Sequence, residues 1–152
     1  MRAEIVSIGT QLLLGELRDT NTAYLASRLP GLGIDLYYVH TVGDKHHRLL
    51  EVLQGAWSRA DLVLCTGGLG PTEDDVTREA IAALLGETMT IDPGLERNLR
   101  RYFAGRLSMP ENNLRQALLI PSAQALPNSR GTAPGWWVPR GHRALVAMPG
   151  PP

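Results

Sequence analysis

The stretch from Thr66 to Asp75, Thr-Gly-Gly-Leu-Gly-Pro-Thr-Glu-Asp-Asp, holds the residue types best suited to chemistry in this chain. Three glycines let the backbone approach a ligand closely, and free N–H groups in such a loop can face an anion, so the stretch predicts a phosphate site. It lacks the G-x-G-x-x-G spacing of dinucleotide-binding loops and the Gly-Lys-Ser/Thr ending of Walker loops, so neither mechanism is indicated. The alternative is that the glycines only make a turn, while residues 72–75 cap the next helix.

Short apolar runs alternate with helical patterns around this loop. We predict strands at 3–8, 34–42 and 62–65, and helices at 21–29, 49–57 and 76–85. Asp44 is placed to cap the second of these helices. Strands that alternate with helices indicate an α/β fold with parallel strands joined by right-handed crossovers.

The last third of the chain has a different pattern. Residues 93–104 predict a helix with Asp92 as its cap, and a polar, turn-rich region begins at Pro110. Residues 136–138 and 144–148 flank a short polar segment and predict a hairpin, so the mostly parallel sheet gains antiparallel strands at one edge.

In an open α/β sheet, ligands bind where loops leave the carboxyl ends of the strands. The three loops that we expect at this edge are 9–15, 43–44 and 66–75. The sequence therefore predicts one site built from segments far apart in the chain.

Composition limits the remaining function classes. The 152 residues predict one domain, and 15 Lys and Arg balance 15 Asp and Glu, so the basic surplus that nucleic-acid binding needs is missing. A single cysteine, the absence of a signal-like start and the lack of an 18-residue apolar run favour a cytoplasmic protein without a membrane span. The chain ends on Pro-Gly-Pro-Pro directly after a predicted core strand, so we expect it to be a fragment of a longer, two-domain protein.

Five sequence blocks together resemble the N-terminal domain of the CinA family, which belongs to the molybdopterin-binding superfamily of MogA and MoaB. The blocks are Gly9-Thr-Gln-Leu-Leu-Leu-Gly15 with the later Asn21, residues 66–77, Asn113-x-Arg-Gln-Ala117, Asn128-x-x-Gly-x-Ala-Pro-Gly135, and the terminal Pro-Gly-Pro-Pro. The resemblance spans nearly the whole chain and implies a three-layer α/β/α fold. It also implies a phosphate-carrying pterin or nucleotide as ligand, metal-dependent hydrolysis of ADP-ribose, and self-association into a homo-oligomer. Longer family members add a C-terminal domain that deamidates nicotinamide mononucleotide.

The resemblance assigns roles to individual residues. Asp44 and Asp75 match the two aspartates that MogA-like relatives need, and as catalytic residues they would hold Mg²⁺ against a pyrophosphate, because Mg²⁺ takes a few carboxylates plus substrate oxygens. The expected ligand-binding residues lie in the same blocks: Thr10, Gln11, Gly67, Gly68, Gly70, Thr72, Asp74, Thr77, Asn113, Asn128, Gly131, Pro149 and Gly150. For Thr77 the alternative is a hydrogen bond to its own helix backbone.

Gln11 departs from the family pattern, in which Glu usually stands at this position. A glutamine side chain can form hydrogen bonds or coordinate weakly, but it cannot act as a base or an anionic ligand. A second function therefore stays open: a binding or assembly module that keeps the pocket without catalysis.

Other side chains that attract attention have simpler interpretations. His46 and His47 are adjacent near a helix start and cannot both face one metal, so we expect them to be solvated. Trp136 and Trp137 alternate across a strand, so only one can face the core. Cys65 lies in an apolar strand and is expected to be an inert core thiol.

Overall fold

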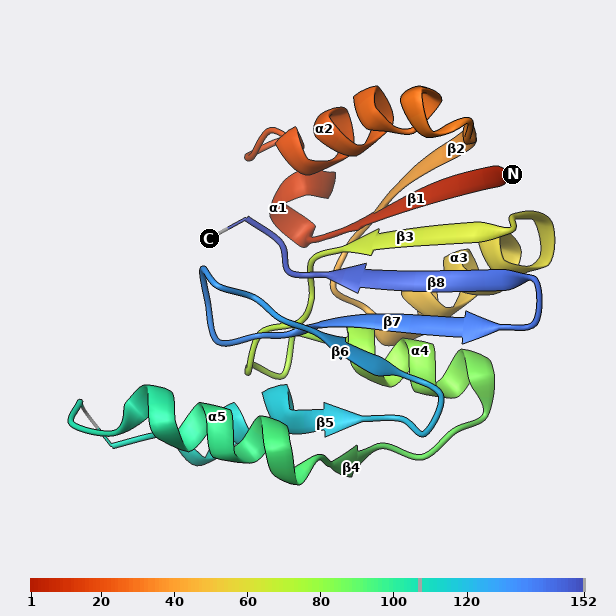
Figure 1. Ribbon diagram of the computed structural model, residues 1–152. Helices are drawn as coiled ribbons and strands as arrows, with labels where there is room; N and C mark the ends of the chain where they lie inside the picture. The colour runs from red at the N-terminus through yellow and green to blue at the C-terminus, as the bar shows by residue number, and fades with distance from the viewer. Residues whose placement is uncertain (107, 152) are drawn as a thin grey trace.

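A computed structural model describes residues 1–106 and 108–151, and its centre is a six-stranded sheet (Figure 1). The strands lie in the order β2-β1-β3-β8-β7-β6. Their bounds are β1 Arg2–Ile8, β2 Asp35–Val42, β3 Leu62–Thr66, β6 Gln124–Leu126, β7 Gly135–Arg140 and β8 Arg143–Met148. β2, β1, β3 and β8 run parallel, whereas β7 is antiparallel to β8 and β6 is antiparallel to β7. The predicted α/β fold, mostly parallel with an antiparallel edge hairpin, is confirmed.

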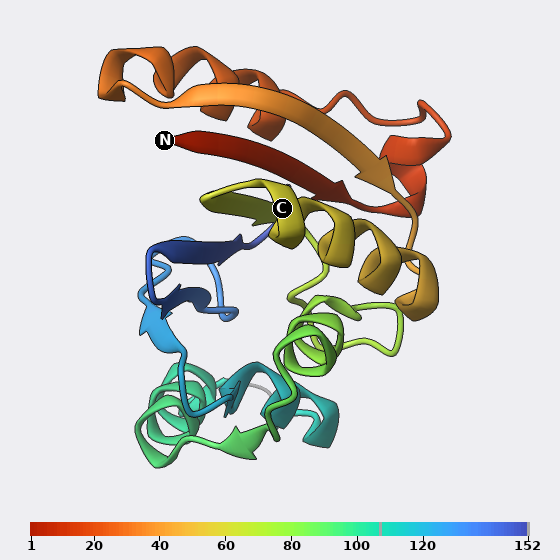
Figure 2. The same cartoon turned by 90° about the vertical axis from the view of Figure 1, so that its right-hand side faces the viewer.

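Helices cover both faces of this sheet, so the molecule has the three layers that the resemblance implies (Figure 2). α2 (Thr20–Arg28) lies on one face, and α3 (His46–Arg59) and α4 (Thr77–Leu85) lie on the other. Because successive side chains of a strand point to opposite faces, β1 sends Ile5 into the core under α2 and Val6 into the core under α3 and α4. Among the described residues, no helix has the length and apolar composition that crossing a bilayer requires.

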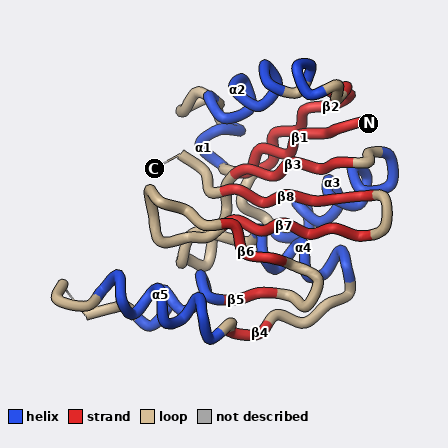
Figure 3. Tube along the Cα trace, viewed as in Figure 1, coloured by secondary structure: helices blue, strands red, loops and turns tan. Residues whose placement is uncertain are grey.

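A smaller unit lies beyond the β6 edge of the sheet (Figure 3). The remaining elements of the chain are α1 Thr10–Leu13, the 3-10 helices η1 Pro30–Leu32 and η2 Glu111–Ala117, α5 Pro93–Phe103, β4 Thr90–Ile91 and β5 Leu118–Leu119. β4 and β5 form a separate antiparallel pair, and the region after Pro110, predicted to be polar and turn-rich, contains η2 and β5. The predicted cap of α5 is confirmed, since Asp92 Oδ1 accepts a hydrogen bond from Leu95 N at 2.9 Å.

Three interpretations of single side chains are confirmed. Trp136 is buried in the core with 1 % of its surface exposed, while Trp137 on the opposite face is half-buried. Burial raises the pKa of the Cys65 thiol to about 12, so it stays protonated and unreactive at neutral pH. His46 and His47 are exposed on the first turn of α3.

Glu4 is a buried carboxylate on β1 that ties the sheet to α3. Its side chain is 1 % exposed, and its two oxygens accept hydrogen bonds from Arg59 Nε and Nη2, both at 2.8 Å. His40 Nε2 on β2 lies 2.8 Å from Glu4 Oε2. Burial raises the pKa of Glu4, but the hydrogen bonds and charges of Arg59 and His40 outweigh burial, so the net pKa lies below its ordinary value. The carboxylate is therefore ionised and paired at neutral pH.

Replacing Glu4 with Gln should lower the free energy of unfolding by about 2 kcal/mol at neutral pH, because hydrogen bonds to a charged group are lost. Since the folded pKa is lowered, this stabilisation is complete above the ordinary glutamate range and disappears as the pH falls through the folded value. Urea unfolding of the parent and Glu4→Gln from about pH 7 to about pH 3 measures the difference, which should shrink on acidification. Glu51→Gln, at an exposed glutamate of α3, is the matched control. A difference that stays constant over this range would contradict the role given to the ion pair.

Candidate functional site

A cleft of about 680 Å³ lies at the carboxyl ends of the parallel strands, on the side to which the arrowheads of β3 and β8 point in Figure 1. Its walls are the loops after β1, β2 and β3, the loop between β6 and β7, and the segment after β8. This is the edge at which we predict ligand binding. Most of the expected ligand residues line the cleft: Thr10, Gln11, Asp44, Gly67, Gly68, Gly70, Asp75, Asn128, Gly131, Pro149 and Gly150.

Thr77, the first residue of α4, holds the first half of the glycine loop (residues 67–70) from inside. Its Oγ1 donates a hydrogen bond to Gly67 O at 2.8 Å, and its backbone N donates to Gly68 O at 3.2 Å. Both glycines have positive φ, 102° and 71°. A Cβ on Gly67 would lie 2.2 Å from Ile8 O, and one on Gly68 would lie 2.1 Å from Thr77 Oγ1. Only glycine fits these two positions.

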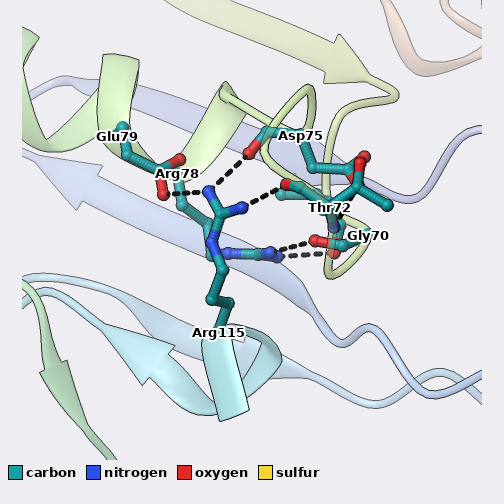
Figure 4. A network of polar contacts seen from close by, with 7 residues as sticks. Gly70, Thr72, Asp75, Arg78, Glu79 and Arg115 are labelled. Carbon is teal, nitrogen blue, oxygen red and sulfur yellow. Dashed lines mark hydrogen bonds and ion pairs between the residues drawn. The ribbon is translucent and has the colours of Figure 1, made fainter. Parts of the chain in front are cut away.

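Arg78, the second residue of α4, holds the other half of the glycine loop. Its side chain is buried, and its guanidinium donates hydrogen bonds to Leu69 O at 2.6 Å and to Gly70 O at 2.5 Å (Figure 4). Burial lowers the pKa of Arg78 to about 10, so the group is still a cation at neutral pH. A buried cation needs polar partners, and here the carbonyl oxygens of the loop are those partners.

The four carbonyls of residues 67–70 are thus turned toward the interior of the protein. In a trans peptide the C=O and the following N–H point in opposite directions, and no peptide bond among the described residues is cis. The N–H groups of Gly68, Leu69 and Gly70 therefore point away from α4, and these residues line the cleft. Successive N–H groups directed at one concavity form an anion site, which favours the phosphate interpretation over a simple turn.

Arg115 of η2 holds the outer part of the loop after β3, the part that follows the glycine loop (Figure 4). It donates hydrogen bonds to Thr72 O and, at 3.2 Å, to Asp75 O, and it forms an ion pair with Glu79 Oε1 at 2.6 Å. The sequence indicates neither this role nor that of Arg78. Arg78 lies in the first turn of α4 and Arg115 in the last turn of η2. Arginines at helix ends are usually surface residues, and only the fold shows that both contact the loop carbonyls.

Asp44 and Asp75, the carboxylates expected to hold a metal, both line the cleft, and each also supports a loop. Asp75 Oδ2 accepts hydrogen bonds from Thr72 N at 2.9 Å and Thr72 Oγ1 at 2.7 Å. Asp44 Oδ2 accepts one from Thr10 N at 3.1 Å, and Asp44 N donates to Thr10 Oγ1 at 3.2 Å. The predicted capping of α3 by Asp44 is wrong. Lys45 occupies the cap position without a side-chain hydrogen bond, and the Asp44 carboxylate binds the start of α1 instead.

The hydrogen bonds of both aspartates run to Oδ2, so Oδ1 of each side chain is the atom that a cation could bind. The described residues contain no cluster of three or more His, Cys, Asp or Glu side chains suited to a metal ion. A cation held by Asp44 and Asp75 would therefore take its other oxygen ligands from a bound molecule and from water, as Mg²⁺ commonly does.

Four of the expected ligand residues do not line the cleft. Thr72 and Asp74 are exposed on the outer part of the loop after β3. Thr77 is fully buried, and its hydroxyl donates a hydrogen bond to the glycine loop from the interior side. Asn113 is also buried, and its Nδ2 donates to Gln116 Oε1 at 3.2 Å.

From the sequence we predict no ligand-binding role for some residues that line the cleft. Asn21, present only as part of the family pattern, donates from Nδ2 to Thr66 Oγ1 at 3.1 Å. Arg130 belongs to a turn that Asn128 shapes, since Asn128 Nδ2 donates to Ala133 O at 2.9 Å and Asn128 Oδ1 accepts from Arg130 N at 3.0 Å. Both polar atoms of the Asn128 side chain therefore form hydrogen bonds within the turn. The sequence does not predict these hydrogen bonds.

Residues 4–152 match the family model described as a probable molybdopterin binding domain. The chain belongs to this family. CinA-like proteins of Thermomicrobium roseum and Deinococcus radiodurans are 53 % identical over 153 residues and 54 % identical over 155 residues. These alignments cover 100 % and 99 % of this chain but 38 % of each relative, so the chain spans well under half the length of either protein. The resemblance to the N-terminal domain of the CinA family is confirmed.

Solved structures of similar proteins have the same fold. The crystal structure of CinA from Thermoplasma acidophilum aligns with a TM-score of 0.92 at 29 % identity, covering 98 % of this chain and 88 % of that one. The molybdopterin biosynthesis enzyme MoaB from Thermus thermophilus aligns with a TM-score of 0.63 at 25 % identity, covering 99 % of this chain and 82 % of that one. The three-layer α/β architecture of the family is therefore that of this domain.

Replacing Arg78 with Met should lower the free energy of unfolding by about 3 kcal/mol, because Leu69 O and Gly70 O lose their buried donors. Urea unfolding measures the loss. The matched control is Arg101→Met at an exposed arginine of α5, which should change stability by less than about 0.5 kcal/mol. Equal stability of the two variants would show that Arg78 does not hold the loop.

Proposed function

We propose that the cleft binds a phosphate-carrying nucleotide or pterin, with phosphate against the N–H groups of Gly68, Leu69 and Gly70. The observation that carries this proposal is the set of hydrogen bonds that Thr77 and Arg78 donate to the loop carbonyls. Because these bonds hold the C=O groups on the α4 side, the N–H groups of the loop point toward the cleft. The volume of about 680 Å³ suits a small molecule. The structurally similar MoaB is a molybdopterin biosynthesis enzyme, which supports a pterin as one of the two ligand classes.

Within the nucleotide class we propose ADP-ribose as the substrate, hydrolysed at its pyrophosphate with a divalent metal. The resemblance to the CinA family supports this choice. In the reaction the oxygen of water bonds to one phosphorus and the P–O bond to the bridging oxygen breaks, which yields AMP and ribose 5-phosphate. The N–H groups of the glycine loop would stabilise the negative charge on the phosphate oxygens throughout this step.

Asp44 and Asp75 are the residues that would hold the metal, through the oxygens not engaged in loop hydrogen bonds. When bound, Mg²⁺ neutralises the charge that builds on the leaving phosphate. Both side chains belong to loops fixed by their own hydrogen bonds, so their carboxylates are positioned before a ligand arrives.

Gln11 supports a second candidate function, ligand binding without hydrolysis. It lines the cleft at the position where relatives usually carry Glu, and an amide supplies neither a base nor a negative charge. The domain would then sense a ligand or hold subunits together. Self-association stays a prediction for this chain.

Incubation with ADP-ribose and Mg²⁺, followed by chromatography of AMP and ribose 5-phosphate, tests the proposal. The parent should form both products only with the metal. Asp75→Asn should reduce the rate about 100-fold, since even groups behind the metal ligands alter activity by 10–100-fold. Its stability should change by less than about 1 kcal/mol, because the amide oxygen can still accept from Thr72.

Glu73→Gln is the control, because Glu73 is an exposed carboxylate of the same loop that does not line the cleft. This variant should hydrolyse ADP-ribose like the parent. An increase in melting temperature with ADP-ribose but no products would establish the binding module instead. Neither products nor a change in melting temperature with ADP-ribose or a pterin phosphate would contradict the proposed function.

A further inference from the structure

A second cavity of about 410 Å³ adjoins the cleft, between α5 and the segment that connects β6 to β7. The two hollows share Asn128, Gly131 and Thr132 as lining residues, so this short turn is the boundary between them. A ligand long enough to pass this turn would therefore reach both cavities.

The walls of the second cavity combine apolar surface with side-chain amides. Leu95, Leu99 and Tyr102 line it from α5, and Pro127 lines it from the segment after β6. Apolar side chains beside an aromatic residue suit a planar ring.

Gln116 supplies a directed polar group in this cavity. It is 3 % exposed, lines the cavity, and accepts a hydrogen bond at Oε1 from Asn113 Nδ2 at 3.2 Å. Its oxygen is thus engaged, which leaves the NH₂ group as the donor available to a ligand. Asn98 adds a second amide, from the exposed side of α5. Amide donors beside an apolar wall select for a ring that carries nitrogen or oxygen acceptors on its edge.

We propose that this cavity binds the planar nitrogen heterocycle of the ligand whose phosphate lies on the glycine loop. The inference rests on the proposed function and extends it, because it places recognition of the ring in a different cavity from the chemistry. An adenine base and a pterin share the required chemistry, a flat aromatic ring with acceptors on its edge. The glycine loop would then bind the phosphate that all such ligands share, and the second cavity would distinguish the ligands by their rings.

Calorimetric titration of four probes tests the proposal: pyrophosphate and ribose 5-phosphate, which lack the ring, and ADP-ribose and neopterin monophosphate, which carry it. Asn98→Trp fills the cavity from an exposed position of α5. It should weaken the ring-bearing ligand at least about tenfold, the scale of a steric change in a binding pocket, and change the two ringless probes less than about twofold. Arg97→Trp, at the neighbouring exposed residue that does not line the cavity, should bind all probes like the parent.

Gln116→Glu is an independent variant, because it keeps an oxygen for Asn113 and replaces the amide donors. It should also weaken only the ring-bearing ligand, and whichever of ADP-ribose and neopterin monophosphate binds the parent more tightly identifies the ring. Unchanged affinity for ring-bearing ligands in Asn98→Trp would overturn this inference alone. If the parent binds none of the four probes, the proposed function fails and this inference fails with it.

Discussion

The direction of four carbonyl groups is the constraint on which the candidate site depends. A loop backbone can present its N–H groups to a ligand only if its C=O groups find partners on the other side. Here Thr77 and Arg78, consecutive residues at the start of α4, provide those partners. Gly67 and Gly68 are required because any side chain there would collide with Ile8 O or with Thr77 itself. The glycines of the loop and the first two residues of α4 are therefore both needed to fix the direction of the loop backbone.

The parallel strands of the sheet determine where the glycine loop lies. β1, β2, β3 and β8 are parallel, so their carboxyl ends bring the glycine loop, the two aspartates and the segment after β8 to one edge. Gly150 packs directly on this arrangement, since a Cβ there would lie 3.1 Å from Gly67 Cα. At the same time Asp44 and Asp75 fix the ends of their loops through Oδ2. The residues that we propose for chemistry are thus also structural, and their contributions to binding and to stability must be measured separately.

Local patterns predict the sheet and the loops after β1, β2 and β3: apolar runs, glycine positions and helix caps such as Asp92. The loop between β6 and β7 and the segment after β8 are predicted as ligand-binding segments only through the resemblance to the CinA family. The sequence does not predict the roles of Arg78 and Arg115, because a charged residue in a short helix is ordinarily exposed. Long-range packing buries Arg78 and brings the half-buried Arg115 against the loop after β3. The cap expected at Asp44 is wrong for a related reason. Its carboxylate has a competing partner, Thr10 N, 34 positions earlier in the chain, and a local pattern contains no information about it.

Amide chemical shifts in ¹⁵N–¹H spectra during titration with pyrophosphate test the central claim most directly. If the inward carbonyls create the anion site, the N–H signals of residues 68–70 move with the added pyrophosphate and saturate together, because charge-assisted hydrogen bonds form at these groups. Gly86 and Gly141, which also have positive φ but lie outside the cleft, serve as internal references and should not move. Saturable binding of pyrophosphate that leaves the signals of residues 68–70 in place would contradict the account.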